Sequence, residues 1–333
     1  MIHQTKTLVT GSTDPYLNLA VEEYLLNGLL PDECIFYLWQ NAKTVVIGRN
    51  QNAYKECRTD KLHADGGFLA RRLSGGGSVY HDLGNLNFTF LANEADFDVA
   101  RQLSVILRAL EDYGIYAEKS GRNDISINER KFSGNAFYQH KERCYHHGTI
   151  LVDVDMSKMN AYLQVSADKL RSHSVESVRS RVINLKELNP AIDIPSVRLS
   201  LLRAFEEIYG RAAIPLDIRE LKQEEISVLR EKYASAEWLY GERMQADYSF
   251  GRRFSWGEVE FLFRIRGESI ADVRIFSDAM DAEVMGLFAD NLRGVPFRAQ
   301  AVHEAVSAAA EEAGPAMIAD IHALINDQDI WKH

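Results

Sequence analysis

The stretch that organises the chain is RRLSGGGSVYHD, residues 71–82. Three consecutive glycines cost backbone entropy on folding and supply no side chain for packing, so a globular protein keeps them mainly where the backbone turns tightly or approaches another group closely. Free N–H groups of a glycine turn beside the fixed charges of Arg71 and Arg72 suit an anion such as a phosphate or a carboxylate. The alternative interpretation is a flexible hairpin loop with both arginines in solvent.

The glycine run follows neither of the common nucleotide-binding fingerprints. No Lys-Ser or Lys-Thr pair follows the glycines, as a Walker loop requires, and the spacing differs from that of a glycine turn that opens a helix. Residues 68–70 before the run are apolar, and residues 86–90 after it alternate between apolar and polar side chains. The sequence therefore predicts a strand, a glycine loop and a second strand, with the ligand held on the loop.

Length and composition indicate a globular protein with two domains or one large one. The 333 residues suffice for either, and a hydrophobic content of 46% with a charged content of 26% is ordinary for soluble chains. No apolar run approaches the roughly 20 residues that span a bilayer, and the N-terminus lacks the layout of a secretory signal, so we expect a cytoplasmic protein. The formal net charge of −10 argues against general nucleic-acid binding, which requires a basic surface.

The three cysteines, Cys34, Cys57 and Cys144, are far apart in the sequence. Their spacing fits neither a disulfide framework nor a paired zinc motif. Cys34 lies in an apolar run and is expected in the core. Cys144 stands two residues before a His-His pair, which leaves a nucleophile conceivable there, although the sequence shows nothing that would activate the thiol.

The order of predicted elements indicates an α+β fold in two parts. Helical spacing, capping residues and turn signals predict helices at 15–27, 99–113, 195–209 and 223–233, with strands at 34–39 and 44–47 among them. After residue 247 the pattern changes to three strands, at 248–255, 259–266 and 270–276, followed by helices. We therefore expect a first domain at 1–240, a linker at 241–247 and a small α+β domain at 248–333.

A predicted β-hairpin carries two charged residues on opposite arms. Residues 125–127 form one arm and residues 130–136 the other, and a turn at 128–129 joins them, so the hairpin carries Asp124 on one arm and Lys131 on the other. Lys131 stands among apolar or small residues and points into a cleft on one interpretation, whereas a surface lysine on a hairpin edge is the alternative. The adjacent His146 and His147 lie in a strand, point to opposite faces and therefore do not form a metal pair.

Taken together, these blocks resemble the lipoate–protein ligase A family. The resemblance rests mainly on four blocks in the family's order: RRLSGGGSVYHD at 71–82, SGRND at 120–124, KFSG at 131–134 and HHGT at 146–149. Weaker matches agree with them: NLAVEE at 18–23, VIGRNQN at 46–52 and SVRSRVINL at 177–185. The C-terminal part is similar in length and layout to the accessory domain of the two-domain ligases.

The resemblance implies a fold, an activity and partners. The catalytic domain, with a mixed sheet and flanking helices, would be similar to biotin ligases and class II synthetases. The enzyme would activate lipoate with ATP and Mg²⁺ to lipoyl-AMP, releasing pyrophosphate. It would then transfer the lipoyl group to a lysine of lipoyl carrier domains, in 2-oxo acid dehydrogenase E2 subunits and in the glycine cleavage H protein, and so scavenge free lipoate.

The resemblance also implies roles for individual residues. Lys131 would be the catalytic residue, in contact with both the nucleotide and the lipoyl carboxylate. The ATP and lipoyl-AMP site would include Arg72, Gly75, Gly76, Gly77, Ser78, Val79, Tyr80, Asp124, Lys131, His147 and Gly148. Lipoate would contact Lys131, Ser74 and Gly75, and a loop carrying Arg179, Ser180 and Arg181 would close over the adenylate. The metal ligands are not assigned.

Elementary chemistry agrees with this assignment. A carboxylate is a poor acyl donor, so it must become a mixed anhydride before an amine attacks it. Attack on the α-phosphorus gathers negative charge, which a fixed ammonium on Lys131 would stabilise in a dry site. The anhydride would hydrolyse in water, so a closing loop is expected. No protein nucleophile is needed, which fits three cysteines without an activating pattern.

Three alternatives share parts of this pattern. Octanoyl- or lipoyl-transferases of the same fold use a cysteine thioester and no ATP, but their cysteine lies beyond the Lys and His blocks, and this chain has no cysteine after Cys144. Biotin ligases carry a phosphate loop with glycine and arginine in a different order. A non-catalytic relative that binds lipoate or a nucleotide is the third alternative.

Overall fold

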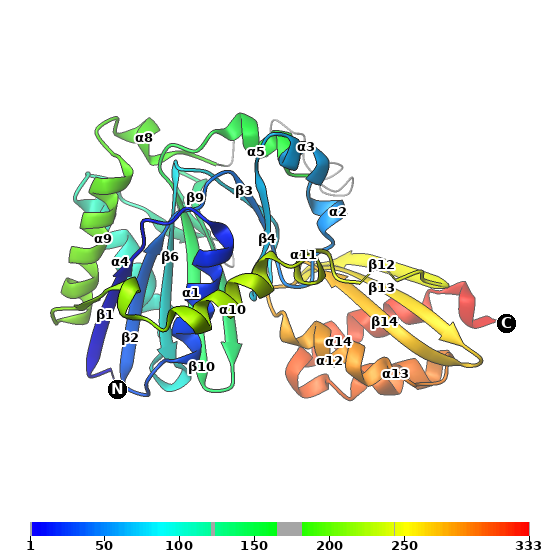
Figure 1. Cartoon of the computed structure of the whole chain (residues 1–333). Helices are drawn as coiled ribbons and strands as arrows, with labels where there is room; N and C mark the ends of the chain where they lie inside the picture. The colour runs from blue at the N-terminus through cyan, green and yellow to red at the C-terminus, as the bar shows by residue number, and fades with distance from the viewer. Residues whose placement is uncertain (1, 121–123, 165–181, 243, 333) are drawn as a thin grey trace. The chain divides into compact units, whose positions relative to one another are not determined.

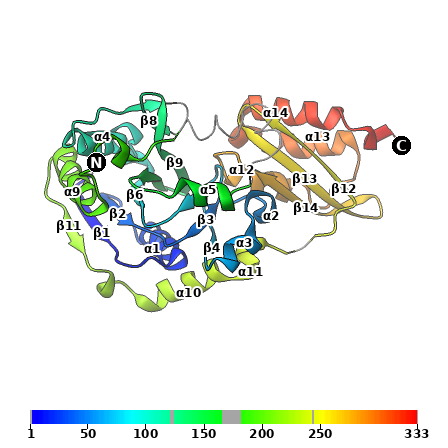
Figure 2. The same cartoon turned by 90° about the horizontal axis from the view of Figure 1, so that it is seen from above.

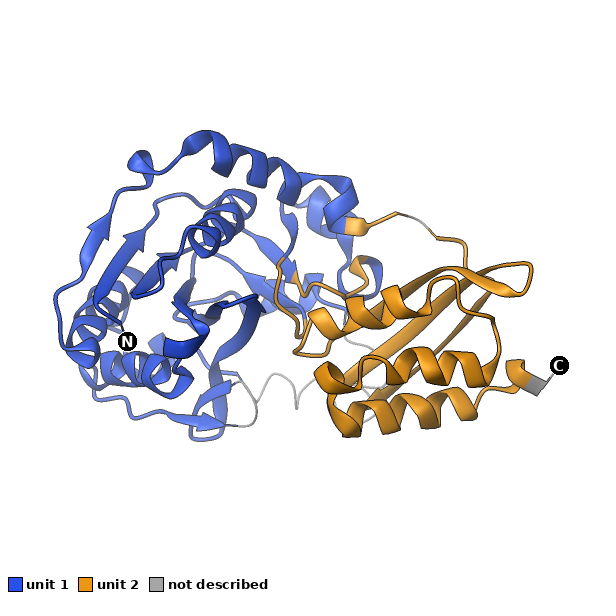
Figure 3. Cartoon of the chain, turned by 90° about the horizontal axis from the view of Figure 1, so that it is seen from below, with its two compact units in different colours: residues 1–46, 54–71, 78–239 blue, residues 47–53, 72–77, 240–333 orange. Residues whose placement is uncertain are grey.

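The computed structural model describes residues 2–120, 124–164, 182–242 and 244–332. The chain forms two compact units (Figure 3). Unit 1 comprises residues 1–46, 54–71 and 78–239, and unit 2 comprises residues 47–53, 72–77 and 240–333. Two short segments from the first part of the sequence, one of them the glycine run, thus belong to unit 2. The domain limits predicted from the sequence were consecutive spans and did not include this exchange.

Unit 1 is built on an eight-stranded mixed sheet with the strand order β11-β1-β2-β6-β10-β9-β8-β7 (Figure 1). β1 runs parallel to β2 and β11, whereas the other neighbours are antiparallel. The strands are β1 (Gln4–Val9), β2 (Glu33–Trp39), β6 (Asn85–Asn93), β7 (Glu118–Ser120), β8 (Asp124–Ile127), β9 (Arg130–His140), β10 (Arg143–Leu151) and β11 (Ile214–Leu216). The predicted mixed sheet with flanking helices is confirmed.

Helices cover both faces of this sheet (Figures 1 and 2). The helices α4 (Val99–Glu111) and α9 (Ile194–Tyr209) pack on one face, where Phe36, Phe88 and Phe90 of the strands meet Phe205 of α9 in the main hydrophobic core. The helix α1 (Pro15–Asn27) lies on the other face and packs against α10 (Gln223–Ala234). Side chains alternate along each strand, so odd-numbered residues of β2, β6 and β10 face α1.

The helices begin and end where capping residues stand in the sequence. Asp14 caps α1 by accepting hydrogen bonds from the N–H groups of Tyr16 and Leu17, and Asp98 caps α4 in the same way through Arg101. The helix α9 ends at Gly210, which is left-handed with φ 66°. The short helices of unit 1 are α3 (Thr59–Ala64), α5 (Met156–Tyr162), α8 (Leu185–Leu188) and α11 (Ala236–Tyr240), with α2 (Ala53–Glu56) spanning the boundary between the units.

A second, three-stranded sheet has the order β4-β3-β5. Its strands are β3 (Thr44–Ile47), β4 (Phe68–Arg71) and β5 (Val79–His81). The two strands predicted at 34–39 and 44–47 both form, as β2 and β3, but they belong to different sheets. The sequence also predicted the strand after the glycine run only from residue 86, whereas β5 precedes it. Both differences arise because strand pairing depends on tertiary packing, which local propensity does not encode.

Unit 2 consists of the antiparallel sheet β12-β13-β14 packed against helices. The strands are β12 (Tyr248–Phe254), β13 (Gly257–Arg266) and β14 (Ser269–Ser277), and the helices are α12 (Glu283–Leu292), α13 (Ala299–Ser307) and α14 (Ala310–Asn326). Phe261, Phe263, Phe288 and Ile321 are in its core. This matches the expected small α+β unit. Among the described residues, no helix is both long enough and apolar enough to cross a bilayer.

Candidate active site

The β8–β9 hairpin forms as the sequence predicted, and it brings Lys131 and Asp124 into contact. Its two turn residues, Asn128 (φ 49°) and Glu129 (φ 64°), are both left-handed, which closes a tight two-residue connection. Lys131 Nζ lies 2.6 Å from Asp124 Oδ1, and about one-third of each side chain is exposed (35% and 33%). The hairpin therefore holds a paired ammonium group that solvent or a ligand can reach.

Gly134 makes room for this lysine. A Cβ atom at position 134 would lie 2.8 Å from Lys131 Nζ, so the lysine side chain crosses directly over the glycine. The N–H group of Gly134 donates to Thr149 Oγ1 of β10 at 3.2 Å, which ties the two strands beneath the lysine. The glycine of the KFSG block is therefore required for steric reasons, because a larger residue at position 134 would displace the ammonium group of Lys131.

A buried polar chain lies on the α1 face of the sheet. His147 Nδ1–H donates to Glu22 Oε1 at 2.9 Å, and Thr89 Oγ1–H donates to the same oxygen at 2.7 Å. Trp39 Nε1–H in turn donates to Thr89 Oγ1 at 3.0 Å. Glu22 is only 2% exposed, so these hydrogen bonds replace the solvation that its carboxyl group loses on burial. Glu22 stands in the NLAVEE block, but no role was predicted for it or for Thr89 and Trp39.

His146 belongs to the opposite face of the same sheet. Its ring nitrogens lie 2.9 Å from Gln102 Oε1 and 2.8 Å from Asn135 Oδ1. Complete burial lowers the pKa of His146 to about 3, so the ring is neutral at physiological pH. Of the two adjacent histidines, only His147 shares a sheet face with Thr149, so the two rings point to opposite faces as predicted.

The arginine beside the glycine run shapes the loop itself. Arg72 is 5% exposed, and its Nε–H donates to Ser74 Oγ at 2.9 Å. Its Nη2 donates to the carbonyl oxygens of Gly75 at 2.6 Å and Gly77 at 2.8 Å. A guanidinium with this set of partners fixes a backbone turn because its donors point in rigid directions. These contacts all lie within unit 2.

The glycines of the run are required by close backbone approaches and by φ angles. Gly76 has φ 86°, and its N–H donates to the carbonyl oxygen of Ala279 at 2.9 Å. A Cβ atom at Gly75 would lie 2.2 Å from the same carbonyl oxygen, and one at Gly48 would lie 2.3 Å from the carbonyl oxygen of Gly76. Gly77 has open space around its Cβ position. The flexible-loop alternative is therefore wrong for Gly75 and Gly76, whose backbones are enclosed.

Arg71 binds backbone carbonyl groups of α11. Its Nε–H donates to the carbonyl oxygen of Trp238 at 2.9 Å, and its Nη2 donates to that of Leu239 at 2.6 Å. Trp238 Nε1–H returns a hydrogen bond to the carbonyl oxygen of Arg71 at 2.9 Å. The expectation of two arginines beside an anion is thus not met by Arg71, which ties β4 to α11, and neither arginine of the pair lies in solvent.

The residues that follow the glycines belong to unit 1. Ser78 Oγ–H donates to Glu56 Oε2 at 3.1 Å, and Val79 and Tyr80 begin β5. Tyr80 is buried against Tyr162, with 5.7 Å between the ring centroids, and its burial raises the pKa of its hydroxyl group. Of the residues predicted from the sequence, Arg72, Ser74, Gly75, Gly76 and Gly77 belong to unit 2 and the others to unit 1. Arg179, Ser180 and Arg181, the predicted closing loop, lie outside the described residues.

All three cysteines are buried and free. Burial raises the pKa of Cys34 and Cys57 to about 12 and that of Cys144 to about 11. At neutral pH each side chain is therefore a thiol rather than a reactive thiolate. This chemistry argues against a covalent acyl-cysteine intermediate.

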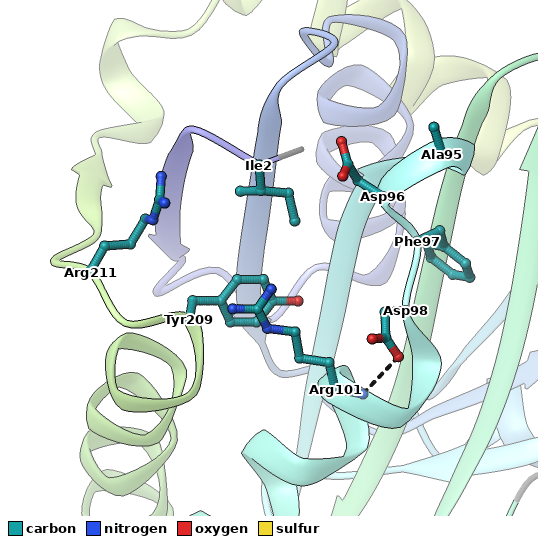
Figure 4. A pocket seen from close by; sticks show the side chains of 8 residues that line it. All are labelled: Ile2, Ala95, Asp96, Phe97, Asp98, Arg101, Tyr209 and Arg211. Carbon is teal, nitrogen blue, oxygen red and sulfur yellow. Dashed lines mark hydrogen bonds between the residues drawn. The ribbon is translucent and has the colours of Figure 1, made fainter.

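A pocket of about 440 Å³ opens at another place in unit 1 (Figure 4). Arg101 lies over the Tyr209 ring, 4.2 Å from its centroid, and the Arg101 backbone N–H donates to Asp98. The pocket is lined by Ile2, Ala95, Asp96, Phe97, Asp98, Arg101, Tyr209 and Arg211. None of these is a predicted site residue.

Two family models match the chain in sequence order. The lipoyl protein ligase A/B catalytic domain matches residues 14–206, and the bacterial lipoate protein ligase C-terminus matches residues 243–325. The lipoate-protein ligase A of Psychrobacter cryohalolentis is 39% identical over 300 residues, which is 88% of each chain. The chain belongs to the lipoate–protein ligase A family.

Solved structures of lipoate ligases share this architecture. LipL1 of P. falciparum, crystallised in complex with lipoate, superposes with a TM-score of 0.85 at 27% identity, covering 97% of this chain and 100% of that one. A lipoate–protein ligase A bound with ATP gives a TM-score of 0.61 at 28% identity, covering 72% and 99%. The predicted enzyme class, an ATP-dependent lipoate–protein ligase that lipoylates lipoyl domains, is confirmed by this family membership.

Proposed function

We propose that Lys131 is the catalytic residue of this lipoate–protein ligase, acting on a lipoyl-AMP intermediate. The observation that carries the proposal is the ammonium group of Lys131, whose side chain is about one-third exposed, paired with Asp124 at 2.6 Å and held over Gly134. The lipoyl carboxylate attacks the α-phosphorus of ATP, and pyrophosphate leaves. The ammonium group stabilises the charge that develops on the phosphoryl oxygens. Asp124 holds the lysine in place until the substrates replace part of this ion pair.

The glycine run and the residues after it bind the nucleotide in this proposal. Gly77, with free space around it, offers its backbone to the phosphates, and Arg72 keeps the turn in shape from inside. The proposed nucleotide and adenylate site consists of Arg72, Gly75, Gly76, Gly77, Ser78, Val79, Tyr80, Asp124, Lys131, His147 and Gly148. The lipoate carboxylate would contact Lys131, Ser74 and Gly75. The loop with Arg179, Ser180 and Arg181 would exclude water from the anhydride.

Mg²⁺ fits this site as a companion of ATP. Mg²⁺ usually binds through one or two carboxylates together with substrate phosphates and water. The part of the chain that the structure describes holds no group of three or more acidic, histidine or cysteine side chains that would form a cage by itself. Asp124 is the carboxylate of the proposed site and would supply the protein ligand. Bound there, Mg²⁺ would neutralise phosphate charge.

The proposed acceptors are the apo lipoyl domains of 2-oxo acid dehydrogenase E2 subunits and the glycine cleavage H protein, met in the cytoplasm. A lysine of the carrier attacks the acyl carbon of lipoyl-AMP, the new C–N bond forms, and AMP leaves. The lysine must lose a proton first, because its unperturbed pKa is about 10.4.

Omission of ATP tests the reaction type directly. Purified protein, lipoate, Mg²⁺ and an apo lipoyl domain should give a lipoylated domain by mass spectrometry only when ATP is present. AMP and pyrophosphate should appear in equal amounts with the product. Modification of the domain without any nucleoside triphosphate would contradict the proposed adenylate.

We expect Cys144→Ser to retain full ligase activity. Cys144 is buried in β10 with its thiol protonated, so it cannot form a thioester readily. The retained activity is measured by comparing the steady-state lipoylation rates of the variant and of the unmodified protein. Complete loss of activity in a variant that still folds, judged by its thermal unfolding, would favour the transferase mechanism instead.

A further inference from the structure

Two asparagines on β6 have buried polar atoms without partners. Asn85 and Asn87 are 0% and 1% exposed, and they are two residues apart, so both point to the same face of the sheet. Asn85 Nδ2 donates to Asn87 Oδ1 at 2.9 Å. Among the described residues nothing bonds to the remaining atoms, Asn85 Oδ1 and Asn87 Nδ2.

The pattern of free groups does not depend on how the amides are oriented. Exchanging the oxygen and nitrogen of both carboxamides reverses the hydrogen bond between them, and again leaves one amide nitrogen and one amide oxygen free. The pair therefore presents one donor and one acceptor in either assignment. Buried polar groups in native proteins are almost always satisfied, because an unsatisfied one destabilises the fold. Retaining both free groups at the start of a buried strand indicates that something else binds them.

The pair lies on the same sheet face as the proposed active site. Asn87 is opposite Trp39 on one side and Thr149 on the other, and Thr89, two residues further along β6, donates to Glu22. Thr149 is bonded in turn to the N–H of Gly134, the residue that Lys131 crosses. A row of residues thus leads across β6, β10 and β9 from the asparagine pair to the catalytic ammonium group.

We propose that Asn85 and Asn87 bind the reacting acyl group during transfer of the lipoyl moiety from lipoyl-AMP to the acceptor lysine. The free amide N–H donates to the acyl carbonyl oxygen, which becomes an oxyanion when the amine attacks. The free amide oxygen accepts an N–H from the attacking amine. The C–N bond forms, the C–O bond to the phosphate breaks with its electron pair going to AMP, and the amine's proton passes to solvent. This inference rests on the proposed adenylate intermediate.

The chemistry of the free groups distinguishes this step from the first one. Phosphates and the lipoate carboxylate are acceptors only, so an amide oxygen facing them would be repelled by their negative charge. An acyl carbonyl together with an amine supplies one acceptor and one donor, which matches the asparagine pair. The pair is therefore suited to the transfer step rather than to binding the phosphates of ATP or the carboxylate of free lipoate.

Asn87→Leu and Asn85→Leu test the proposal because leucine has a similar volume and no polar atoms. Lipoyl-AMP formation is measured from lipoate and ATP without acceptor, and transfer is measured in a single turnover from preformed lipoyl-AMP to a lipoyl domain. Loss of a donor to a developing oxyanion lowers rates by roughly 10²- to 10³-fold, so we expect Asn87→Leu to slow transfer by about this factor. Adenylate formation should change far less, even though Tm falls somewhat because the hydrogen bond between the two asparagines is lost.

Gln102→Met provides a matched control. Gln102 is another fully buried carboxamide with an unpartnered amide nitrogen, but it packs against His146 on the opposite face. We expect this variant to lose stability and to keep its transfer rate. Unchanged transfer in both asparagine variants would overturn the proposal, as would a parallel loss of Tm and of both half-reactions. Failure of the unmodified protein to form lipoyl-AMP would instead refute the adenylate on which the inference rests.

Discussion

Lys131→Ala is expected to abolish measurable adenylate formation while leaving the protein folded. The variant removes the fixed positive charge that faces the reacting phosphoryl group, and removal of one such group typically costs about 10²- to 10³-fold in rate. The Lys131–Asp124 pair is about one-third exposed, and ion pairs of this kind contribute only about 0–1 kcal/mol to stability. Lipoyl-AMP production by mass spectrometry and Tm by differential scanning calorimetry give the two readouts.

Lys186→Ala is a suitable control for this variant. Lys186 also pairs with a carboxylate, Asp153, at 2.5 Å in unit 1, but both side chains are about half exposed and neither is a predicted site residue. Its loss should leave both adenylate formation and Tm almost unchanged. If Lys131→Ala instead makes lipoyl-AMP at a near-normal rate, Lys131 does not act on the phosphoryl group.

Gly48→Ala is expected to weaken ATP use strongly, although position 48 was not among the predicted site residues. The added Cβ would lie 2.3 Å from the carbonyl oxygen of Gly76 and 3.3 Å from the carbonyl carbon of Gly75. Both are backbone atoms, so the glycine run itself must shift. A displacement of about 1 Å at a reacting group costs on the order of 10²-fold in rate. We expect a fall of that size in kcat/KM for ATP, together with destabilisation of about 1–3 kcal/mol from overpacking.

Gly286→Ala is the control that separates the steric effect of the new Cβ on the glycine run from the general effect of replacing glycine by alanine. Gly286 lies within α12, and a Cβ there meets no other atom within 4 Å. Alanine in a helix is favoured over glycine by up to about 1 kcal/mol, so this variant should be at least as stable as the unmodified protein and equally active. Normal ATP kinetics in Gly48→Ala would show that the glycine run tolerates displacement and does not position the nucleotide.

Local sequence signals were sufficient for the helices and for the hairpin that carries Lys131. Asp14-Pro15 and Asp98 mark helix starts because a side-chain oxygen satisfies the free N–H groups of a first turn, and this chemistry needs no distant residue. The Asn128-Glu129 turn could be located in the sequence, so the hairpin with Asp124 and Lys131 on opposite arms was predicted, whereas the ion pair between them appeared only in the structure. The domain limits and the individual site roles stay predictions.

Contacts between distant segments could not be predicted in this way. In the sequence Arg71 and Arg72 are equivalent neighbouring cations, but Arg71 binds the carbonyl groups of Trp238 and Leu239, and Arg72 binds those of its own loop. The Glu22 carboxyl group meets His147 from a position 125 residues away. Such pairings depend on which strand faces which helix, and no local pattern records that.

By itself, the sequence determined the family, the reaction class, the capped helices and the lysine on its hairpin, because each of these depends on residues close together in the chain or on motifs that keep their order. Only the tertiary structure decided which polar groups are satisfied. It assigned Arg71 to a structural contact, enclosed Gly75 and Gly76 between backbones, and left Asn85 and Asn87 with one free donor and one free acceptor. Burial and partnership depend on packing in three dimensions, and they are what distinguishes a side chain that stabilises the fold from one that is available to a substrate.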